Sequence, residues 1–303
     1  MKLLTFRPSR ARNPHFGVLL SDGRVLDLTA VGGRAMPDSL IDCIRAGEAG
    51  LAAVRAALDA AEDELRAGRT PASTVVLSHV ELLAPLRPGK IMAVGRNYSD
   101  HAREIAGAAY TRPNGFIKNA SCVIGPNEPI RKPRWTKQLD YENELAIVIG
   151  VDCVNVDPQR WADVVFGYTI CNDVSARDVQ AAERKEGNIM IGKNFPTAAP
   201  LGPWVVTRDE IADPHNLRVR TRVNGEPRQD SNTSHQIHRI ASQIAWYSQG
   251  GFEAGDVVST GSPGGTGVGY AGPGTWFLQH GQEIECEIEG IGVLKNPVRN
   301  ARS

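Results

Sequence analysis

The sequence predicts an α+β protein that is rich in β-strands. Its 303 residues include 31 glycines and 19 prolines, which recur between short apolar runs as the turns of antiparallel sheets do. Residues 283–289 alternate glutamate with isoleucine or cysteine, the pattern of a strand with one buried face. Residues 51–67 instead place leucine and valine on one face with the period of a helix. We therefore expect mostly strands and a few helices.

Residues 1–85 are predicted to form a small N-terminal α/β domain. Its expected elements are short strands at 2–6, 16–20 and 24–28 and two helices that residues 47–50 separate. The proline-rich segment 84–90 marks a boundary, so residues 86–303 form a second domain. Residues 1–85 hold no cluster of titratable groups at chemically useful spacing, and we assign them a packing or interface role.

The second domain continues the strand-rich pattern. Strands are expected at 91–95, 145–149, 167–171, 204–207, 217–223 and 257–260. Asn224 and Gly225 form the turn of a hairpin. The stretch from Thr233 to Gln236 matches a capping box, which predicts a helix at about 235–248.

Composition excludes several classes of protein. Thirty-four basic and 34 acidic residues give a formal net charge of zero, so nothing favours nucleic acid or an anionic membrane as partner. The five cysteines are scattered and odd in number, which indicates reduced thiols in a cytoplasmic protein. The N-terminal residues lack the apolar stretch of a signal peptide, and no apolar run approaches the length of a membrane span.

Three carboxylates near strand ends form the first candidate site. Glu142 and Glu144 precede or begin the buried run 145–149 and, two residues apart, share one face of a strand. Asp173 follows the strand at 167–171. Three carboxylates completed by water suit Mg²⁺, whereas the alternatives are a solvated acidic strand end and, for Asp173, a helix N-cap.

His101 and Glu104 form the second candidate. They lie three residues apart on a predicted short helix, so they share a face. A carboxylate beside an imidazole fixes its tautomer and raises its basicity, which suits a general base. The alternative is a surface pair. His235 and His238 have the same spacing without a third ligand, and we interpret them as an exposed helix face.

The remaining candidates are cationic, amide or glycine residues. Arg177, Gln180 and Lys193 near a cation would suit a 2-oxo carboxylate. Residues 264–269 resemble a phosphate loop but lack its Gly-Lys-Ser/Thr ending and its βαβ context. A tight loop that presents backbone N–H groups to an anion is the interpretation we favour.

Taken together, these residues resemble the fumarylacetoacetate hydrolase family, in particular its acylpyruvase-like or 2-hydroxyhepta-2,4-diene-1,7-dioate isomerase-like members. The match runs in order over about residues 91–298. Its fragments are Gly-Arg-Asn-Tyr-x-x-His-x-x-Glu (95–104), Asp-Tyr-Glu-x-Glu-Leu-Ala (140–146), Gly-Tyr-Thr-x-x-Asn-Asp-x-Ser-Ala-Arg-Asp-x-Gln (167–180), Gly-Lys-Asn-Phe (192–195), Leu-Gly-Pro-Trp (201–204), Val-Asn-Gly-Glu (223–226), Gly-Asp-Val-Val-Ser-Thr-Gly (255–261) and Gly-Ile-Gly-x-Leu-x-Asn (290–296).

The resemblance implies roles for single residues. Its implied ligands of Mg²⁺ or Mn²⁺ are Glu142, Glu144 and Asp173, its implied catalytic residues are His101, Glu104 and Lys193, and its implied substrate-binding residues are Arg96, Tyr98, Arg177, Gln180, Thr260 and Gly261. It gives Asp140 no ligand role, and we expect Asp140 to orient a neighbour such as Lys193 or a metal-bound water. Pro196 and the turn at 260–263 depart from the family pattern, which bears on the choice of substrate.

The resemblance also implies a fold and an activity. The fold is a mixed β-sandwich roll with a small leading domain, usually in a homodimer. The activity is metal-dependent hydrolysis of a C–C bond in a 2,4-dioxo acid, an acylpyruvate or fumarylpyruvate, through a metal-bound enolate. Alternatives on the same site are an oxaloacetate-type decarboxylase and an isomerase of an unsaturated dicarboxylate. A catalytically idle scaffold is the alternative from another class, against which the complete carboxylate set argues.

Overall fold

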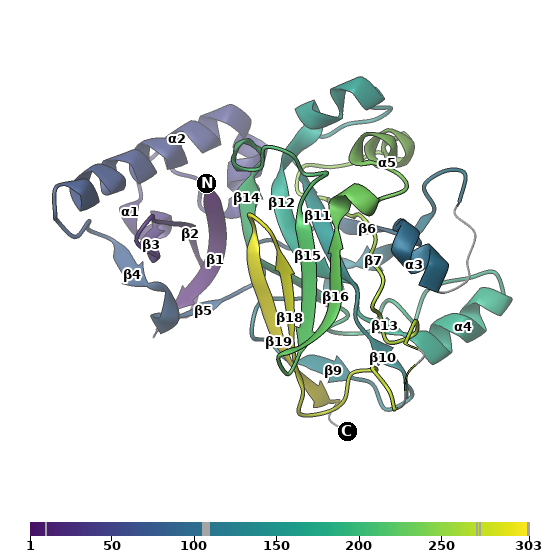
Figure 1. Cartoon of the computed structure of the whole chain (residues 1–303). Helices are drawn as coiled ribbons and strands as arrows, with labels where there is room; N and C mark the ends of the chain where they lie inside the picture. Colours follow the sequence, from purple (N-terminus) through teal and green to yellow (C-terminus); the bar gives the residue numbers. More distant parts are fainter. Residues whose placement is uncertain (10, 105–109, 271, 273, 302–303) are drawn as a thin grey trace.

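The computed structural model describes every residue except 10, 105–109, 271, 273 and 302–303. Its strands form a twelve-stranded mixed sheet, a five-stranded sheet and a two-stranded ladder (Figure 1). Helices cover parts of these sheets rather than alternating with parallel strands. This arrangement confirms the predicted strand-rich α+β class.

The first part of the chain builds one end of the large sheet. Its elements are β1 (Lys2–Pro8), β2 (His15–Leu19), β3 (Arg24–Asp27), α1 (Leu28–Val31), α2 (Leu40–Arg66), β4 (Thr74–Val76) and β5 (Val80–Leu82). The predicted interruption lies within α2, where Gly47 has φ 57° and ψ −134°, a left-handed backbone that favours glycine. The expected break is therefore confirmed, and α2 consists of two helical segments that meet at a kink at Gly47.

The second part supplies the remaining strands and helices. Its elements are β6 (Lys90–Val94), α3 (Ser99–Glu104), β7 (Gly115–Asn119), β8 (Val123–Ile124), β9 (Ile130–Lys132), β10 (Leu139–Asp140), β11 (Asn143–Ile149), β12 (Val165–Asn172), β13 (Ser175–Ala176), α4 (Arg177–Lys185), β14 (Ala199–Thr207), β15 (Arg218–Val223), β16 (Glu226–Asn232), α5 (Ile240–Tyr247), β17 (Val257–Ser259), β18 (Glu283–Ile288) and β19 (Gly292–Asn300).

The large sheet runs through both predicted domains. Ten of its strands follow the order β4-β3-β2-β1-β14-β12-β11-β17-β6-β7, β5 pairs with β1, and β8 pairs with β14. The antiparallel pair β1–β14 joins the two parts. The N-terminal ammonium of Met1 adds a hydrogen bond of 2.6 Å to Thr207 Oγ1, at the end of β14. The division at residue 85 stays a prediction, and the backbone ladder of one sheet crosses it.

Strand β11 is the centre of the large sheet. All seven of its residues are buried, as expected for the run 145–149. It pairs antiparallel with β12 on one side and with β17 on the other, and β17 in turn pairs parallel with β6. Strands β15 and β18 pack against β11, and β18 and β19 pack against β12 and β14, so the central strands are covered (Figure 1).

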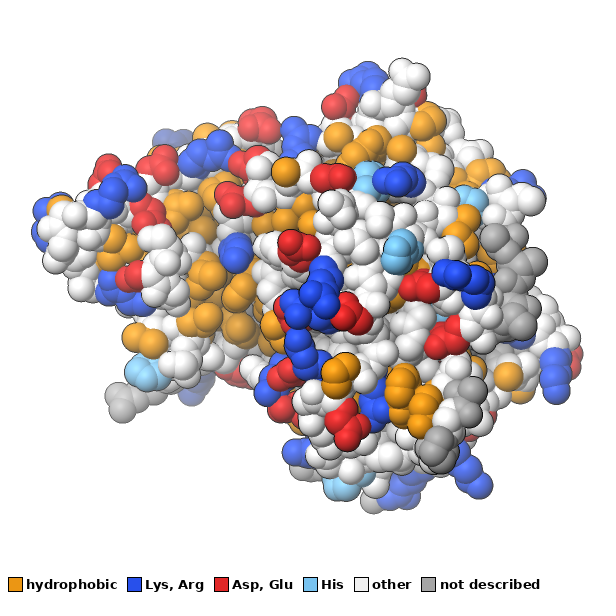
Figure 2. Space-filling view, in the orientation of Figure 1, with side chains coloured by type: hydrophobic (Ala, Val, Ile, Leu, Met, Phe, Trp, Pro, Cys, Tyr) orange, Lys and Arg blue, Asp and Glu red, His pale blue; other side chains and the backbone are white. Residues whose placement is uncertain are grey.

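The five-stranded sheet has one buried and one charged face. Its order is β16-β15-β18-β19-β9, and every second residue of β18 is buried, which confirms the alternation of residues 283–289. On the outer face, Figure 2 shows basic and acidic side chains side by side. Their ion pairs join Arg218 to Asp230 and join Arg220 and Arg222 to Glu287. This face is therefore balanced in charge.

One predicted helix start is wrong. Residues 233–235 form a single 3₁₀ turn and α5 begins only at Ile240. The Thr233 hydroxyl accepts a hydrogen bond from the backbone of Leu217 and is not available as a cap. The hairpin at Asn224 and Gly225 is confirmed between β15 and β16, with both residues at positive φ. Among the described residues, no helix combines the length and the apolarity that crossing a membrane requires.

Candidate active site

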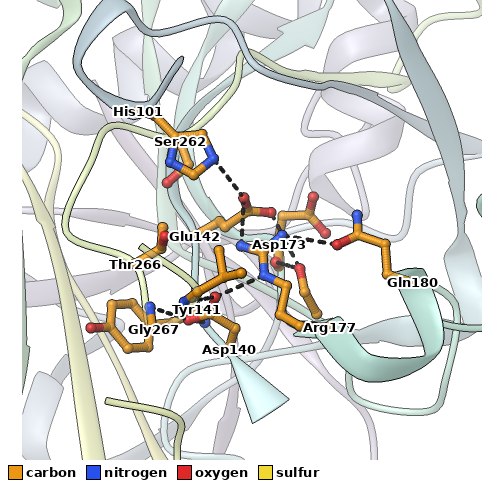
Figure 3. Close-up of polar contacts among 12 residues, drawn as sticks. His101, Asp140, Tyr141, Glu142, Asp173, Arg177, Gln180, Ser262, Thr266 and Gly267 are labelled. Carbon is orange, nitrogen blue, oxygen red and sulfur yellow. Dashed lines mark hydrogen bonds and ion pairs between the residues drawn. The ribbon is translucent and has the colours of Figure 1, made fainter. Parts of the chain in front are cut away.

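The three carboxylates meet at one edge of β11 and β12. Asn143 pairs with Asn172 in this ladder, so Glu142 and Asp173 lie just outside it on the same edge, and the Asp173 amide donates to the Glu142 carbonyl at 2.9 Å. Ligand oxygens of Glu142, Glu144 and Asp173 all lie within 4.8 Å of one another, and all three residues are buried. The structure thus brings the three predicted ligands together, and Figure 3 shows two of them, Glu142 and Asp173, side by side.

Three buried cations surround these carboxylates. Lys193 Nζ contacts Glu142 and lies 2.6 Å from Asp173 Oδ2. Lys118 Nζ lies 2.7 Å from the other oxygen of Asp173, and Arg177 Nη2 lies 2.8 Å from Glu142 Oε1. The placement of Lys193 beside two ligands agrees with its predicted role in neutralising charge.

The nearby cations lower the pKa of Glu142 but leave the pKa of Glu144 raised. Burial alone would raise the pKa of Glu142, but Arg177 and Lys193 hold that pKa well below its usual range. Burial, reinforced by repulsion from Asp173 and Glu142, raises the pKa of Glu144 well above its usual range. Among the described residues, Glu144 accepts hydrogen bonds from the Ser259 hydroxyl at 2.6 Å and the Gly261 amide at 2.9 Å but contacts no cation.

A divalent cation fits this donor set. Hard cations such as Mg²⁺ and Mn²⁺ prefer oxygen ligands, and three carboxylates face one another here at close range. One of them, Glu144, has neutral donors only and gains most from an added positive charge. Glu142, Glu144 and Asp173 are therefore the residues that would hold such an ion.

His101 and Glu104 lie beside the carboxylates. Both belong to α3, and His101 Nδ1 is 3.1 Å from Glu104 Oε2. The opposite ring nitrogen, Nε2, lies 3.9 Å from Glu142 Oε1 (Figure 3). The imidazole is buried, with 5% of its side chain exposed. The pair is thus directed at the carboxylate cluster and is not a surface pair.

The glycine-rich loop after β17 presents its N–H groups to two carboxylates of the protein. Gly265 donates to Glu104 Oε1 at 2.9 Å, and Gly267 donates to Asp140 Oδ1 at 2.7 Å. A Cβ atom on Gly269 would lie 1.9 Å from Glu104 Cδ, so only glycine leaves room for Glu104 there. The anion-binding loop expected from the sequence holds side chains of the site itself.

Asp140 orients Arg177 rather than Lys193. Its Oδ2 accepts from Arg177 Nε at 2.7 Å and from the Val268 amide at 3.0 Å, and Asp140 is fully buried. The expected contact with Lys193 is therefore replaced by one with Arg177, because β10 pairs with β13 directly before α4. Asp140 thus connects the glycine-rich loop to a cation of the site.

Replacing Asp140 with asparagine should lower the free energy of unfolding by about 2 kcal/mol, because a buried charge-assisted hydrogen bond to Arg177 loses its ionic partner. Urea unfolding measures this loss. Asp230→Asn is the matched control, because its pair with Arg218 is exposed to solvent and should contribute much less to stability. Equal losses in the two variants would contradict this structural role of Asp140.

A cavity of about 230 Å³ opens above the carboxylates. Its lining residues are Val94, Gly95, Arg96, His101, Phe116, Gln138, Glu142, Glu144, Asp173, Arg177, Gln180, Ala181, Arg184, Lys193, Ser262 and Val268. The predicted residues Arg96, Arg177 and Gln180 are among them. Gln180 Oε1 accepts from Arg177 Nη1 at 3.1 Å, and Gln180 Nε2 is buried without a partner in the described part of the chain, which leaves a donor for a ligand.

Three predicted substrate contacts lie behind the cavity wall. Tyr98 is fully buried, and its hydroxyl accepts from Gln236 Nε2 at 3.4 Å. The Thr260 hydroxyl donates to the Leu145 carbonyl at 2.9 Å, and the Gly261 amide binds Glu144. These residues support the cavity from outside, and their predicted contacts with substrate stay predictions.

Lys118 is the main residue that the sequence analysis missed. It lies on β7, outside the strands that the sequence predicts, and its side chain is fully buried. Besides Asp173, its Nζ contacts the carbonyl of Lys193 at 2.5 Å. The Phe116 ring, on the same strand, lies 5.0 Å from Lys193 Nζ, but no pattern in the sequence marks Lys118 as a residue of the site.

Comparison with known proteins agrees with this geometry. Residues 90–299 match the model of the fumarylacetoacetate (FAA) hydrolase C-terminal family. The chain belongs to the fumarylacetoacetate hydrolase family. The matched region includes all of β6 to β18 and with it every residue that lines the cavity.

Relatives within the family carry different activities in their names. A mitochondrial oxaloacetate tautomerase of Xenopus laevis is 39% identical over 302 residues, which cover 98% of this chain and 90% of that protein. The fumarylacetoacetate hydrolase of Exiguobacterium antarcticum is 35% identical, with a TM-score of 0.81 over 99% of this chain and 100% of the other. A maleylpyruvate hydrolase of Sphingobium sp. SYK-6, solved with manganese(II) and pyruvate, is 29% identical, with a TM-score of 0.77 over all of both chains.

Proposed function

We propose that this protein moves a proton between the carbon and the oxygen of a 2-oxo acid, as a metal-dependent keto–enol tautomerase of an oxaloacetate-type substrate. The observation that carries the proposal is the position of His101, with Nδ1 on Glu104 and Nε2 directed at the carboxylate cluster. Support comes from the relative named an oxaloacetate tautomerase, which aligns over 98% of this chain.

The residues of the chain divide the work of this reaction. Mg²⁺ or Mn²⁺ held by Glu142, Glu144 and Asp173 would polarise the keto oxygen and thereby acidify the neighbouring C–H bond. Glu104 can hold a proton on His101 Nδ1, which leaves Nε2 free to accept the proton from carbon. Nε2 then returns the proton to the former keto oxygen, which gives the enol. The substrate is thus rearranged without gain or loss of atoms.

Other residues orient the substrate. The buried Nε2 of Gln180 offers a hydrogen bond to a substrate oxygen, and Arg177 holds Gln180 Oε1 in place. Lys193 keeps its positive charge because Asp173 and Glu142, acting against the effect of burial, raise its pKa. The 2-oxo carboxylate head of the substrate thus meets donors and positive charge beside the base.

Enol oxaloacetate is the substrate that tests this proposal. Its ultraviolet absorbance should decay faster when protein and Mg²⁺ or Mn²⁺ are present together, and protein stripped of metal by EDTA should leave the uncatalysed rate. Proton NMR in D₂O should show catalysed exchange at C3. A metal-loaded protein that accelerates neither process would contradict the proposal.

Hydrolysis of a 2,4-dioxo acid is the second candidate, and the similarity to maleylpyruvate hydrolase favours it. The same His101 nitrogen would deprotonate a water that attacks the distal carbonyl, which splits the C–C bond and releases pyruvate. Pyruvate release from an acylpyruvate, coupled to lactate dehydrogenase, separates this reaction from tautomerisation. The homodimer and the cytoplasmic location stay predictions.

A further inference from the structure

Two arginines on the wall of the cavity have no anionic partner. Arg96 precedes α3 and Arg184 lies in the last turn of α4, and both line the cavity. Within the described part of the chain, neither makes an ion pair, and the Nε atom of Arg96 is buried without a hydrogen-bond partner. Arg177, deeper in the cavity, is by contrast paired with Asp140 and Glu142.

Helix α4 places Arg177 deep in the cavity and Arg184 near its rim. Arg177, Gln180, Ala181 and Arg184 all line the cavity and follow the spacing i, i+3, i+4, i+7 of one helix face. Seven residues of helix extend about 10 Å, so one face of α4 leads from the carboxylate cluster to the rim. A ligand whose head lies at the cluster therefore has Arg184 at its far end.

The arginines repel one another where they stand. The Arg184 side chain is exposed at the rim, and the protein atoms around it, together with repulsion from Arg96 and Arg177, lower its pKa. The Arg96 guanidinium lies over the Tyr110 ring at 5.5 Å, a contact that compensates little of this charge. Unpaired guanidinium groups that converge on one cavity favour an anion, and carboxylates bind them by two parallel hydrogen bonds.

We propose that Arg184, together with Arg96, binds a second carboxylate at the far end of the substrate, so that the enzyme selects 2-oxo dicarboxylic acids over 2-oxo monocarboxylic acids. This inference rests on the proposed function for the position of the 2-oxo head. It adds Arg184 as a specificity-determining residue, which would recognise the second carboxylate of an oxaloacetate-type substrate. Simple acylpyruvates, which lack the second carboxylate, leave Arg184 unpaired and are the poorer ligands.

Binding measurements test the second carboxylate without turnover. Calorimetry of the Mg²⁺-loaded protein compares 2-oxoglutarate, which has a second carboxylate, with 2-oxobutanoate, which has none. We expect 2-oxoglutarate to bind at least about 10-fold more tightly, as for one charge-assisted pair. Arg184→Gln should remove that advantage and leave the affinity for 2-oxobutanoate unchanged, and Arg184→Lys should restore part of it.

Lys185→Gln is the matched control, because it removes a positive charge from the same helical turn without lining the cavity. It should leave both affinities unchanged. An affinity ratio that stays the same in Arg184→Gln, or falls equally in Lys185→Gln, would overturn the inference.

Turnover separates this inference from the proposed function. With oxaloacetate, Arg184→Gln should raise KM about 10-fold with little change in kcat, since Arg184 lies away from the base. If the binding pattern holds while oxaloacetate is not tautomerised, the carboxylate site stands and the reaction is wrong. If tautomerisation occurs and Arg184→Gln leaves KM unchanged, the reaction stands and the carboxylate site is wrong.

Discussion

Replacement of Glu144 by glutamine should weaken the binding of Mg²⁺ or Mn²⁺ by about 100-fold or more and remove turnover with it. Among the described residues, Glu144 is the one ligand of the three that forms no ion pair with a cation of the protein, so its charge is the part of the cluster that a divalent ion satisfies. Glutamine keeps an oxygen for the Ser259 hydroxyl and the Gly261 amide and leaves no buried cation unpaired. The variant should therefore fold.

Proton release provides a second measurement on the same residue. Burial and the neighbouring carboxylates raise the pKa of Glu144, so Glu144 keeps its proton to a higher pH than an exposed glutamate does, and a cation that binds there competes with that proton. Metal affinity should consequently weaken as the pH falls. Calorimetry in buffers of different ionisation enthalpy should detect more proton release on metal binding by the wild type than by Glu144→Gln.

Glu285→Gln is the control, because Glu285 is a half-exposed carboxylate of β18 that pairs with Lys295 far from the cluster. Its metal affinity should equal that of the wild type. A Glu144→Gln protein that binds manganese normally would show that the ion lies elsewhere.

Replacement of His101 by asparagine should slow tautomerisation by about 100- to 10,000-fold, the usual contribution of a general base. Asparagine retains a polar group near Glu104 but has no atom at the position of Nε2, which is the nitrogen that faces Glu142. The effect should fall on kcat while the affinity for Mn²⁺ changes less than about threefold. Stopped-flow decay of enol oxaloacetate and manganese titration measure the two quantities.

His235→Asn is the matched control for this variant. His235 Nδ1 lies 3.0 Å from Ser231 Oγ, which also donates to Asp100 at the start of α3, so His235 adjoins the same helix without facing the cavity. Its replacement should preserve kcat. Full tautomerisation by His101→Asn would exclude His101 as the base. Decarboxylation of oxaloacetate needs no attacking water, so that reaction could persist in the variant.

Much of the fold follows from local patterns. Neighbouring residues are enough to predict three features: the buried run in β11, the alternation in β18 and the hairpin turn at Asn224 and Gly225. The start of α5 could not be predicted, because the Thr233 hydroxyl binds a backbone N–H that lies 16 residues earlier in the chain. The pairing of β1 with β14 is equally nonlocal.

The same distinction applies to the site. The Glu-x-Glu spacing and the His101–Glu104 spacing are visible along the chain, whereas their convergence depends on the ladder between β11 and β12 and on the parallel pair of β6 and β17. Lys118 carries no such signal, because its burial results from the neighbouring Asp173. Arg184 is one of several arginines until α4 is placed against the cavity.

The order of four neighbouring strands, β12-β11-β17-β6, divides the chemistry into two units. The first pair carries the carboxylates, while α3 and the glycine-rich loop leave from the same edge of the parallel second pair. A change in the length of either segment can therefore reposition the base without touching a ligand. Because the metal ligands and the base belong to separate units, tautomerases and hydrolases could evolve from one ancestral metal site. Grafting a different loop after β17 could likewise convert one activity into the other.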